Sequence, residues 1–181
     1  IANSAAIMMY PETHLEMVRA GIILYGFYPS EDVDKTKLPL RRVLTLKSRI
    51  THIKEIENRG VSYGRTYIAD KKTKVATVPV GYADGYTRML NNNAKIIANG
   101  KAVKVIGRIC MDQCMIDVTN VHNISTGDEV IIFGEDIVTA DDLAQSLGTI
   151  NYEIVCMLSR RIPRVYLYNG KVVATVNYLT E

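Results

Sequence analysis

The sequence predicts a mainly β protein, in which a short helix-and-strand segment precedes an antiparallel β domain that carries one or two short helices. Apolar and polar residues alternate with a period of two from Leu44 onward, as expected for strands with one buried face. The dipeptides Asn99-Gly100 and Asn169-Gly170 each stand between two strand-like runs, and Asn-Gly favours a type I′ hairpin turn. Apolar residues make up 48% and charged residues 23% of the 181 residues, which is typical of a globular protein with one sizeable core.

The first thirty residues have a different pattern. A short apolar run is followed by "PETHLEMVRAG" at 11–21, which has helical character, and by "GIILYGFYPS" at 21–30, a continuous apolar run. This order predicts a buried parallel strand with a helix before it, as in α/β architecture. The polar stretch "EDVDKTKLPLR" at 31–41 contains a proline and predicts a boundary.

After the boundary, strand-like runs follow one another. Because most of them alternate or flank a turn signal, we expect residues 44–181 to be largely antiparallel β. The runs are "LTLKSRITHIKEI" at 44–56, "KVATVPVG" at 74–81, "AKIIANGKAVKVIGRI" at 94–109, "CMIDVTNV" at 114–121, "DEVIIFG" at 128–134 and "RVYLYNGKVVATV" at 164–176.

One stretch of this region predicts helices instead. Thr139 and Asp142 have the spacing of a capping box, and Gly148 is suited to the end of the helix that they begin. A second helix is expected over "NYEIVCMLS" at 151–159, before Pro163 returns the chain to a strand.

Charge and hydropathy indicate the class of protein. The net charge of +3 comes from dispersed lysines and arginines, so a tail that binds polyanions is not expected. The longest apolar runs are well below the roughly 18 residues that span a bilayer, and the first residues lack a basic signal region. We therefore expect a cytoplasmic protein without membrane contact from this region. Because the chain opens at Ile1 rather than Met, we expect it to be a piece of a longer protein.

Three cysteines occur in the sequence. Cys110, Cys114 and Cys156 are an odd number, which favours reduced thiols over a disulfide framework. No histidine or second cysteine pair stands at a spacing typical of metal ligands, so we expect Cys110 and Cys114 to be buried apolar thiols and expect no metal site.

Polar residues at the ends of apolar runs are the candidates for function, because rigid strand ends often carry functional groups. Taken singly, each such tyrosine or arginine fits a packing or surface role as well. Their order is more informative. The motifs are "NSAA" at 3–6, "VRAGIILYG" at 18–26, "VSYGRTY" at 61–67, "PVGYADGY" at 79–86 with Arg88, "GRICMDQCMIDV" at 107–118, "GDEV" at 127–130 and "INYEIVCMLSRRIPRVY" at 150–166.

Together these motifs resemble the C-terminal part of the alanine racemases, the fold-type III enzymes that use pyridoxal 5′-phosphate. The resemblance implies a homodimer of two-domain chains, each with an N-terminal (β/α)₈ barrel and a C-terminal antiparallel β-barrel-like domain. Residues 1–33 would be the last segment of a truncated (β/α)₈ barrel, and residues 34–181 the β domain. The family's cofactor lysine lies in a stretch like "KANAYGHG", which does not occur here. The chain as given is therefore expected to be inactive alone.

The resemblance also implies residue roles. Tyr63 would be one of two acid/base groups, because racemisation needs a proton removed from one face of the α-carbon and another delivered to the opposite face. Arg19 would face the pyridine nitrogen of the cofactor. Met111 would meet the substrate carboxylate through its backbone N–H. The phosphate would be held by the Ser4 and Tyr152 hydroxyls and the N–H groups of Gly21 and Ile22.

A further set would line a narrow entrance that favours small amino acids. Its members are Tyr82, Arg88, Arg108 and Ile150. In this family Tyr63, Tyr82 and Met111 serve the cofactor of the other subunit, whereas Ser4, Arg19 and Tyr152 serve the cofactor of their own.

Two alternatives stay open. A serine racemase of the same family would differ by a few pocket residues, and an apolar pocket discriminates poorly against one added hydroxyl. A stand-alone β-barrel module that binds nucleic acid would use the 11 tyrosines and basic strands as a stacking surface. The leading interpretation is the C-terminal domain of an isomerase that supplies D-alanine for peptidoglycan, with no nucleic-acid partner.

Overall fold

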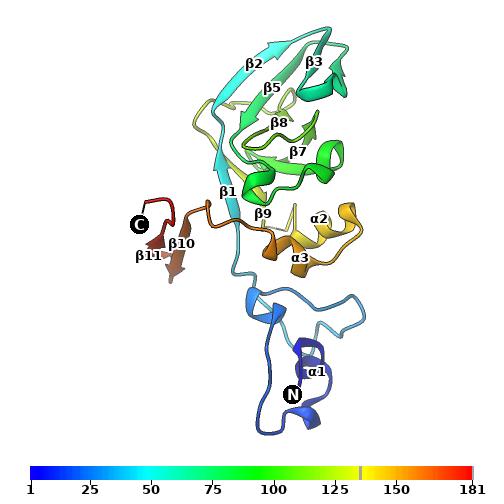
Figure 1. Cartoon of the computed structure of the whole chain (residues 1–181), viewed down its shortest axis with the longest axis vertical. Coiled ribbons are helices and arrows are strands. Elements are labelled where there is room, and N and C mark those ends of the chain that lie inside the picture. Colours follow the sequence, from blue (N-terminus) through cyan, green and yellow to red (C-terminus); the bar gives the residue numbers. More distant parts are fainter. Residues whose placement is uncertain (135, 181) are drawn as a thin grey trace.

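A computed structural model describes residues 1–134 and 136–180 of the chain. The N-terminal segment lies at one end of the molecule and a curled β-sheet at the other, with two helices between them (Figure 1). The predicted fold class, a mainly β chain with a barrel-like antiparallel sheet and few helices, is confirmed. No helix within the described residues is long and apolar enough to cross a membrane.

The main sheet has seven strands in the order β1-β9-β6-β7-β8-β5-β2. Its two edge strands, β1 and β2, are consecutive in the chain and are separated only by Ile50 and Thr51. Ile50 donates its N–H to Asp128 and Thr51 donates its N–H to Thr77, so the connection is bonded to both sides of the sheet. The sheet must therefore curl until its edges meet. The strands are β1 (Leu46–Arg49), β2 (His52–Ile56), β5 (Thr73–Val78), β6 (Lys95–Ala98), β7 (Lys101–Ile106), β8 (Cys114–Asp117) and β9 (Glu129–Phe133).

The barrel-like sheet encloses the core. Side chains that alternate along its strands point inward, and Val78, Val105, Ile116 and Ile132 are fully buried there. Burying a Val or Ile side chain contributes roughly 1.5–3 kcal/mol, so this alternation is the main reason that the strands hold their register. The sequence prediction of strands over these runs is confirmed.

Both Asn-Gly turns have the predicted conformation. Asn99 and Gly100 have φ values of 46° and 73°, as a type I′ turn requires at its two central positions. Asn169 and Gly170 have φ values of 48° and 74° and join the last two strands, β10 (Arg164–Tyr168) and β11 (Lys171–Val176).

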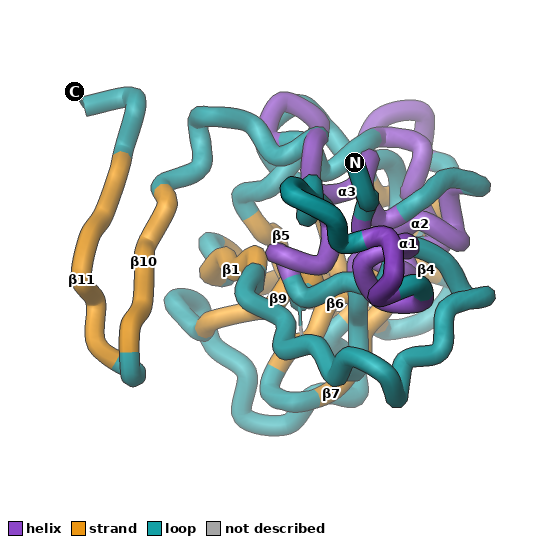
Figure 2. The backbone as a smooth tube through the Cα atoms, turned by 90° about the horizontal axis from the view of Figure 1, so that it is seen from below, coloured by secondary structure: helices purple, strands orange, loops and turns teal. Residues whose placement is uncertain are grey.

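This last hairpin stands apart from the rest of the chain. Figures 1 and 2 both show β10 and β11 to one side of the sheet and the helices. Its side chains are mostly exposed, and none of them belongs to the buried core.

A smaller β unit covers the end of the main sheet. Strands β3 (Arg59–Val61) and β4 (Tyr67–Ala69) pair with each other and enclose the short 3₁₀ helix η3 (Tyr63–Arg65). Val61 and Ala69 pack with Ile56 and Ile106 of the main sheet in a second hydrophobic cluster. The turn that carries Tyr63 is thus attached to the barrel through both flanking strands.

Two helices follow the main sheet, as predicted. In α2 (Ala140–Leu147) the Thr139 hydroxyl accepts the N–H of Asp142, and the Asp142 carboxylate accepts the N–H of Thr139, which is a complete capping box. Gly148 ends this helix with a φ of 69°. The second helix is α3 (Asn151–Cys156).

The N-terminal segment differs from its prediction. The expected strand over 21–30 is wrong, because η2 (Ile22–Tyr25) is a 3₁₀ helix whose Leu24 and Tyr25 are exposed. A strand needs a neighbour to satisfy its backbone groups. This segment instead closes local bonds, from the N–H of Leu24 to the carbonyl of Gly21 and from Gly26 to Ile23.

The expected helix over 11–21 is also largely wrong. Only the 3₁₀ turn η1 (Pro11–Thr13) forms there, and the longer helix α1 (Ser4–Met9) lies just before it. The Asn3 side chain begins α1 by accepting the N–H of Ala6 at 3.0 Å.

Cys110 and Cys114 are buried, as predicted, and Cys156 is exposed. The exposed position follows from the face of α3 on which this residue lies. No cluster of three or more histidine, cysteine, aspartate or glutamate side chains that could hold a metal ion occurs among the described residues.

Candidate active-site surface

The turn that carries Tyr63 has an unusual backbone. Ser62 and Arg65, on either side, adopt positive φ values of 63° and 47°, which residues other than glycine rarely do. Such strained positions cost about 1–3 kcal/mol each and cluster at functional sites. The Ser62 hydroxyl donates to the carbonyl oxygen of Arg108 at 2.5 Å, which fixes the turn against the segment that follows β7.

Glycines allow this turn to approach closely. A Cβ on Gly107 would lie 2.8 Å from the carbonyl oxygen of Val61, and a Cβ on Gly64 would lie 3.3 Å from the Arg108 guanidinium. The Arg108 side chain therefore lies beside the Tyr63 turn.

The turn that carries Tyr82 contacts the same segment from the other side. The 3₁₀ helix η4 (Tyr82–Asp84) begins after Gly81, and the N–H of Tyr82 donates to the carbonyl of Cys110 at 3.1 Å. The next N–H, of Ala83, donates to the carbonyl of Met111 at 3.0 Å. A Cβ on Gly81 would lie 2.3 Å from that same carbonyl oxygen, so no larger residue fits without a shift.

The structure thus brings four predicted site residues to one surface, on which residues 108–113 lie between the two tyrosine turns. The four are Tyr63, Tyr82, Arg108 and Met111. The Tyr63, Met111 and Tyr82 side chains are 71%, 52% and 43% exposed. Arg88, the first residue of η5 (Arg88–Asn93), is exposed and follows the Tyr82 turn closely in the chain. Large side chains held on rigid turns but left in solvent are typical of a surface that another molecule covers.

A pocket of about 450 Å³ adjoins Tyr63. Its lining includes Ser62, Cys110 and Gln113, together with basic side chains of β2 and β3, among them Lys54 and Arg59. The mixture of polar, basic and apolar groups suits a small polar ligand or a polar protein surface.

A second group of predicted residues lies in the N-terminal segment. A parallel bridge joins Ala2 to Val18, and the N–H of Arg19 donates to the carbonyl of Ala2 at 2.7 Å. These contacts bring Gly21 to Ser4, whose Oγ accepts the Gly21 N–H at 3.0 Å.

The Ser4 hydroxyl is the buried member of this group. Ser4 is 4% exposed and Ile22 is 3% exposed, whereas the Arg19 side chain is exposed. Ile22 begins η2, and the first N–H groups of a helix have no acceptor within it. This corner therefore places the buried Ser4 hydroxyl beside the first N–H of η2, and the Gly21 N–H is bonded to that hydroxyl. A hydroxyl and an N–H at the start of a helix are groups that can bind an anion.

The start of α3 is bonded to the last part of the N-terminal segment. Asn151 donates to the carbonyl of Tyr28 at 2.9 Å and to Asp141 at 2.7 Å, and its side chain is buried. Ile150 and Tyr152 flank it and are exposed and half-buried, respectively. The beginning of α3 is therefore held against the N-terminal segment.

The two groups lie far apart within one chain. Figure 1 shows α1, which begins at Ser4, at the opposite end of the molecule from β3, which ends two residues before Tyr63. One chain does not bring Tyr63 to its own Ser4 corner.

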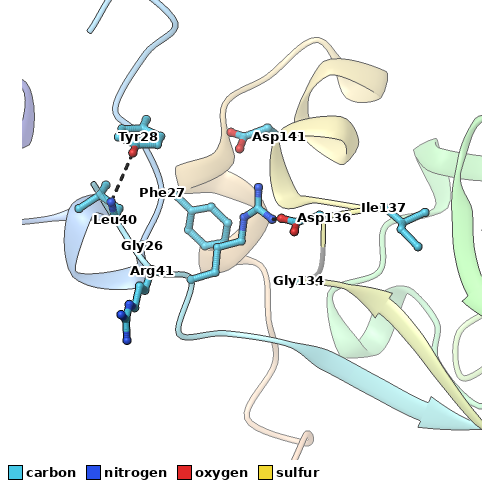
Figure 3. A pocket seen from close by; sticks show the side chains of 10 residues that line it. Gly26, Phe27, Tyr28, Leu40, Arg41, Gly134, Asp136, Ile137 and Asp141 are labelled. Carbon is cyan, nitrogen blue, oxygen red and sulfur yellow. Dashed lines mark hydrogen bonds and ion pairs between the residues drawn. The ribbon is translucent and has the colours of Figure 1, made fainter. Parts of the chain in front are cut away.

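Another pocket, of about 690 Å³, belongs to neither group. Figure 3 shows it between the N-terminal segment, the turn after β9 and the start of α2. An ion pair between Arg42 and Asp136 crosses it, and the Tyr28 hydroxyl accepts the N–H of Leu40 at its edge. This pocket is the joint between two parts of the chain, and we assign no chemistry to it.

Asp84 and Asn151 make central contacts, although the sequence did not predict them as site residues. Asp84 accepts the N–H of Gly81 at 2.9 Å, and Asn151 makes the bridge just described. Both stand inside the motifs quoted from the sequence. The available signal for Asp84 was its place in a turn between Gly81 and Gly85, where an aspartate commonly stabilises the turn backbone.

Comparison with known proteins shows which family the chain belongs to. Residues 43–166 match the family model "Alanine racemase, C-terminal domain", and residues 1–29 match "Alanine racemase, N-terminal domain". The chain is 57% identical to alanine racemase 1 of Clostridium acetobutylicum, over 99% of this chain and 47% of that protein. It is 55% identical to the alanine racemase of Clostridium novyi, over 99% of this chain and 48% of that protein. The chain spans about half the length of the curated relatives that it matches.

Solved structures give the same result. An alanine racemase of Clostridium difficile 630 superposes with a TM-score of 0.95 at 54% identity, covering 98% of this chain and 47% of that one. The alanine racemase of Bacillus anthracis, solved with bound L-Ala-P, has a TM-score of 0.91 at 38% identity, covering 99% of this chain and 47% of that one. Because the C-terminal family model matches more than half of the chain, this protein belongs to the alanine racemase family.

Proposed function

We propose that this chain is the C-terminal part of a pyridoxal-phosphate-dependent alanine racemase, which interconverts L- and D-alanine and so supplies D-alanine for peptidoglycan. In this proposal residues 1–33 complete the cofactor barrel of the longer chain, and residues 34–181 form the β domain. The observation that carries the proposal is the contact of the Tyr63 and Tyr82 turns with residues 108–113, because it gathers the candidate acid/base, entrance and carboxylate-binding groups on one surface.

The residues of the N-terminal corner fit a cofactor phosphate. The buried Ser4 hydroxyl and the N–H of Ile22 at the start of η2 would donate to the phosphate, and the Gly21 N–H, which is bonded to Ser4 Oγ here, would turn to the phosphate when it is bound. Tyr152, at the start of α3, supplies the remaining hydroxyl in this proposal. The exposed Arg19 guanidinium would donate to the ring nitrogen of the cofactor, and because arginine stays protonated it would do so without transferring its proton.

When bound, the cofactor withdraws electrons from the substrate α-carbon. Tyr63 acts at one face of that carbon, where its phenol oxygen removes or returns a proton. The lysine that serves the other face lies outside this chain, so the chain alone is proposed to be inactive.

The remaining residues orient the substrate and restrict access. The backbone N–H of Met111 donates to the substrate carboxylate. Tyr82, Arg88, Arg108 and Ile150 line the entrance, where packed rings and guanidinium groups exclude bulky side chains.

The separation of the two groups supports a shared site. Since one chain keeps Tyr63 and the Ser4 corner at opposite ends, a complete set of groups requires two chains. We therefore propose a homodimer in which Tyr63, Tyr82 and Met111 serve the site of the partner subunit.

The proposal is tested with the full-length protein that carries this sequence. Racemisation of L-alanine and of L-serine is followed by chiral chromatography in the presence of pyridoxal phosphate. Turnover of alanine with the higher kcat/KM supports the proposal. Preference for serine would replace it with the serine racemase alternative, and turnover of neither would overturn it.

A further inference from the structure

Three turns meet at the end of the sheet where Tyr82 lies. The N–H groups of Tyr82 and Ala83 bond to the carbonyls of Cys110 and Met111, as described above. The third turn follows α3, and its Ser159 N–H donates to the carbonyl of Asp84 at 3.1 Å. A Cβ on Gly85 would lie 2.1 Å from the carbonyl oxygen of Met157, so this third turn also packs closely on the Tyr82 turn.

One side chain of the third turn reaches both of the others. The Arg161 Nη2 lies 2.7 Å from Asp112 Oδ1, and its Nε lies 3.3 Å from Asp84 Oδ1. Asp112 directly follows Met111, and Asp84 ends η4, which begins at Tyr82. The planar guanidinium carries donors in a fixed fork, which lets one residue bind two carboxylates at defined positions.

The two carboxylates differ in what else holds them. Asp84 is largely buried, with a side-chain exposure of 13%, and its other oxygen accepts the N–H of Gly81. Asp112 is 59% exposed, and the ion pair with Arg161 is the side-chain contact that restrains it among the described residues. Arg161 therefore holds Asp112, the residue beside Met111, at a defined position relative to the Tyr82 turn.

We propose that Arg161 is a positioning residue, which sets the distance between the Tyr82 side chain at the entrance and the Met111 N–H that meets the substrate carboxylate. This inference rests on the proposed function for its catalytic consequence and on the contacts of Arg161 for its structural part.

The contribution of Arg161 to folding is small by comparison. Exposed ion pairs contribute little to stability, and the Arg161 side chain is 40% exposed and outside both hydrophobic clusters. The contact between the Met111 N–H and the substrate carboxylate is present both in the ground state and in the transition state. Weakening it therefore raises KM and leaves kcat nearly unchanged.

The first experiment measures kinetics of the full-length protein with alanine. For Arg161→Gln we expect KM to rise about tenfold and kcat to stay within about twofold of the wild-type value. This is the result expected when substrate binding is weakened equally in the ground state and the transition state. Arg161→Lys restores KM in part, because an ammonium group is a point charge that reaches one carboxylate at a time. Arg160→Gln is the matched control, since Arg160 lies over the Tyr178 ring and contacts neither aspartate.

A double-mutant cycle tests the route. Asp112→Asn is expected to raise KM as Arg161→Gln does, and the double variant is expected to be no worse than either alone. Additive effects, an unchanged KM in Arg161→Gln, or a loss of kcat that follows a lowered Tm would each overturn the inference.

The second experiment does not depend on activity. Amide hydrogen exchange of the full-length protein is measured for Tyr82, Ala83 and Ser159, whose N–H groups make the bonds between the turns. Arg161→Gln is expected to speed their exchange while Ile116, in the sheet, is unchanged. Unchanged exchange at all three amides overturns the inference. If the wild-type protein is inactive but exchange is faster in Arg161→Gln, the proposed function is contradicted and the positioning role of Arg161 is supported.

Discussion

The backbone N–H of Tyr82 donates to the carbonyl oxygen of Cys110, 3.1 Å away, on a turn that comes much later in the chain. With the matching bond from Ala83 to Met111, this contact makes two distant motifs one rigid unit. The Tyr63 turn joins the same unit through the bond from Ser62 to Arg108. The candidate site is therefore organised by residues 108–113, and its functional groups depend on backbone contacts as much as on side chains.

Replacement of Tyr63 by phenylalanine tests the acid/base role. In the full-length protein, Tyr63→Phe is expected to lower kcat for alanine by about 100- to 10,000-fold, because the phenol proton is lost while the ring remains. Steady-state racemisation measures the change. Tyr67→Phe, on β4 a few residues away, is the control and is expected to retain activity. Activity within tenfold of wild type in Tyr63→Phe would contradict the role.

Complementation tests whether the sites are shared between subunits. A full-length variant without its cofactor lysine and a Tyr63→Phe variant are each expected to be nearly inactive. When both are refolded together, one of the two sites in the mixed dimer contains both groups, so activity should reappear at up to about a quarter of the wild-type level if subunits pair at random. Refolding each variant alone is the control, and no recovery in the mixture would place both groups in one subunit.

The close approach at Gly81 gives a steric prediction. Gly81 has an ordinary φ of −146°, so alanine meets no backbone strain there, but its Cβ would lie 2.3 Å from the Met111 carbonyl oxygen. We expect Gly81→Ala to lower the free energy of unfolding by about 1–3 kcal/mol and to reduce kcat/KM, because the Tyr82 turn must move. Urea denaturation and racemisation measure the two effects.

Gly100→Ala is the control for this substitution. Gly100 has a φ of 73°, and a Cβ added there would have no other atom within 4 Å, so alanine meets strain of about 1–2 kcal/mol without a clash. Activity is expected to be unchanged. Equal activity in the two variants would show that the Gly81 contact does not position the site.

The buried Tyr86 gives a prediction about pH. Its hydroxyl has no hydrogen-bond partner among the described residues, and burial raises the pKa of Tyr86 well above 10. The unfolded chain loses this proton near pH 10 while the folded chain keeps it. Ionisation of Tyr86 therefore leaves the free energy of unfolding unchanged below about pH 10. Above pH 10 it lowers the free energy of unfolding by about 1.4 kcal/mol per pH unit, as long as the folded chain keeps the proton.

Tyr86→Phe removes both effects. At pH 7 the variant is expected to be as stable as wild type or up to about 2 kcal/mol more stable, because an unpaired polar group is no longer buried. At pH 11 its advantage should increase. Tyr166→Phe, on the exposed β10 strand, is the control with no expected change. A variant less stable than wild type at pH 7 would indicate that the hydroxyl is hydrogen-bonded.

The sequence predicted the parts whose signals are local. The capping box at Thr139 and the type I′ turns at Asn99 and Asn169 depend on a few adjacent residues, and each has the expected geometry. The strands were predictable because one buried face imposes alternation over several residues. The segment at 21–30 was not, because a continuous apolar run becomes a strand only beside another strand, and none of the described strands lies next to it.

By itself, the sequence determined the β pattern, the turns and the ordered motifs that indicate the family. Tertiary structure alone decided which motifs meet: Tyr63 and Tyr82 share a surface through residues 108–113, and Arg161 bridges Asp84 and Asp112. The physical reason is the distance along the chain over which each interaction acts. Backbone preference and burial on one face act between near neighbours, whereas hydrogen bonds between turns depend on how the whole sheet curls.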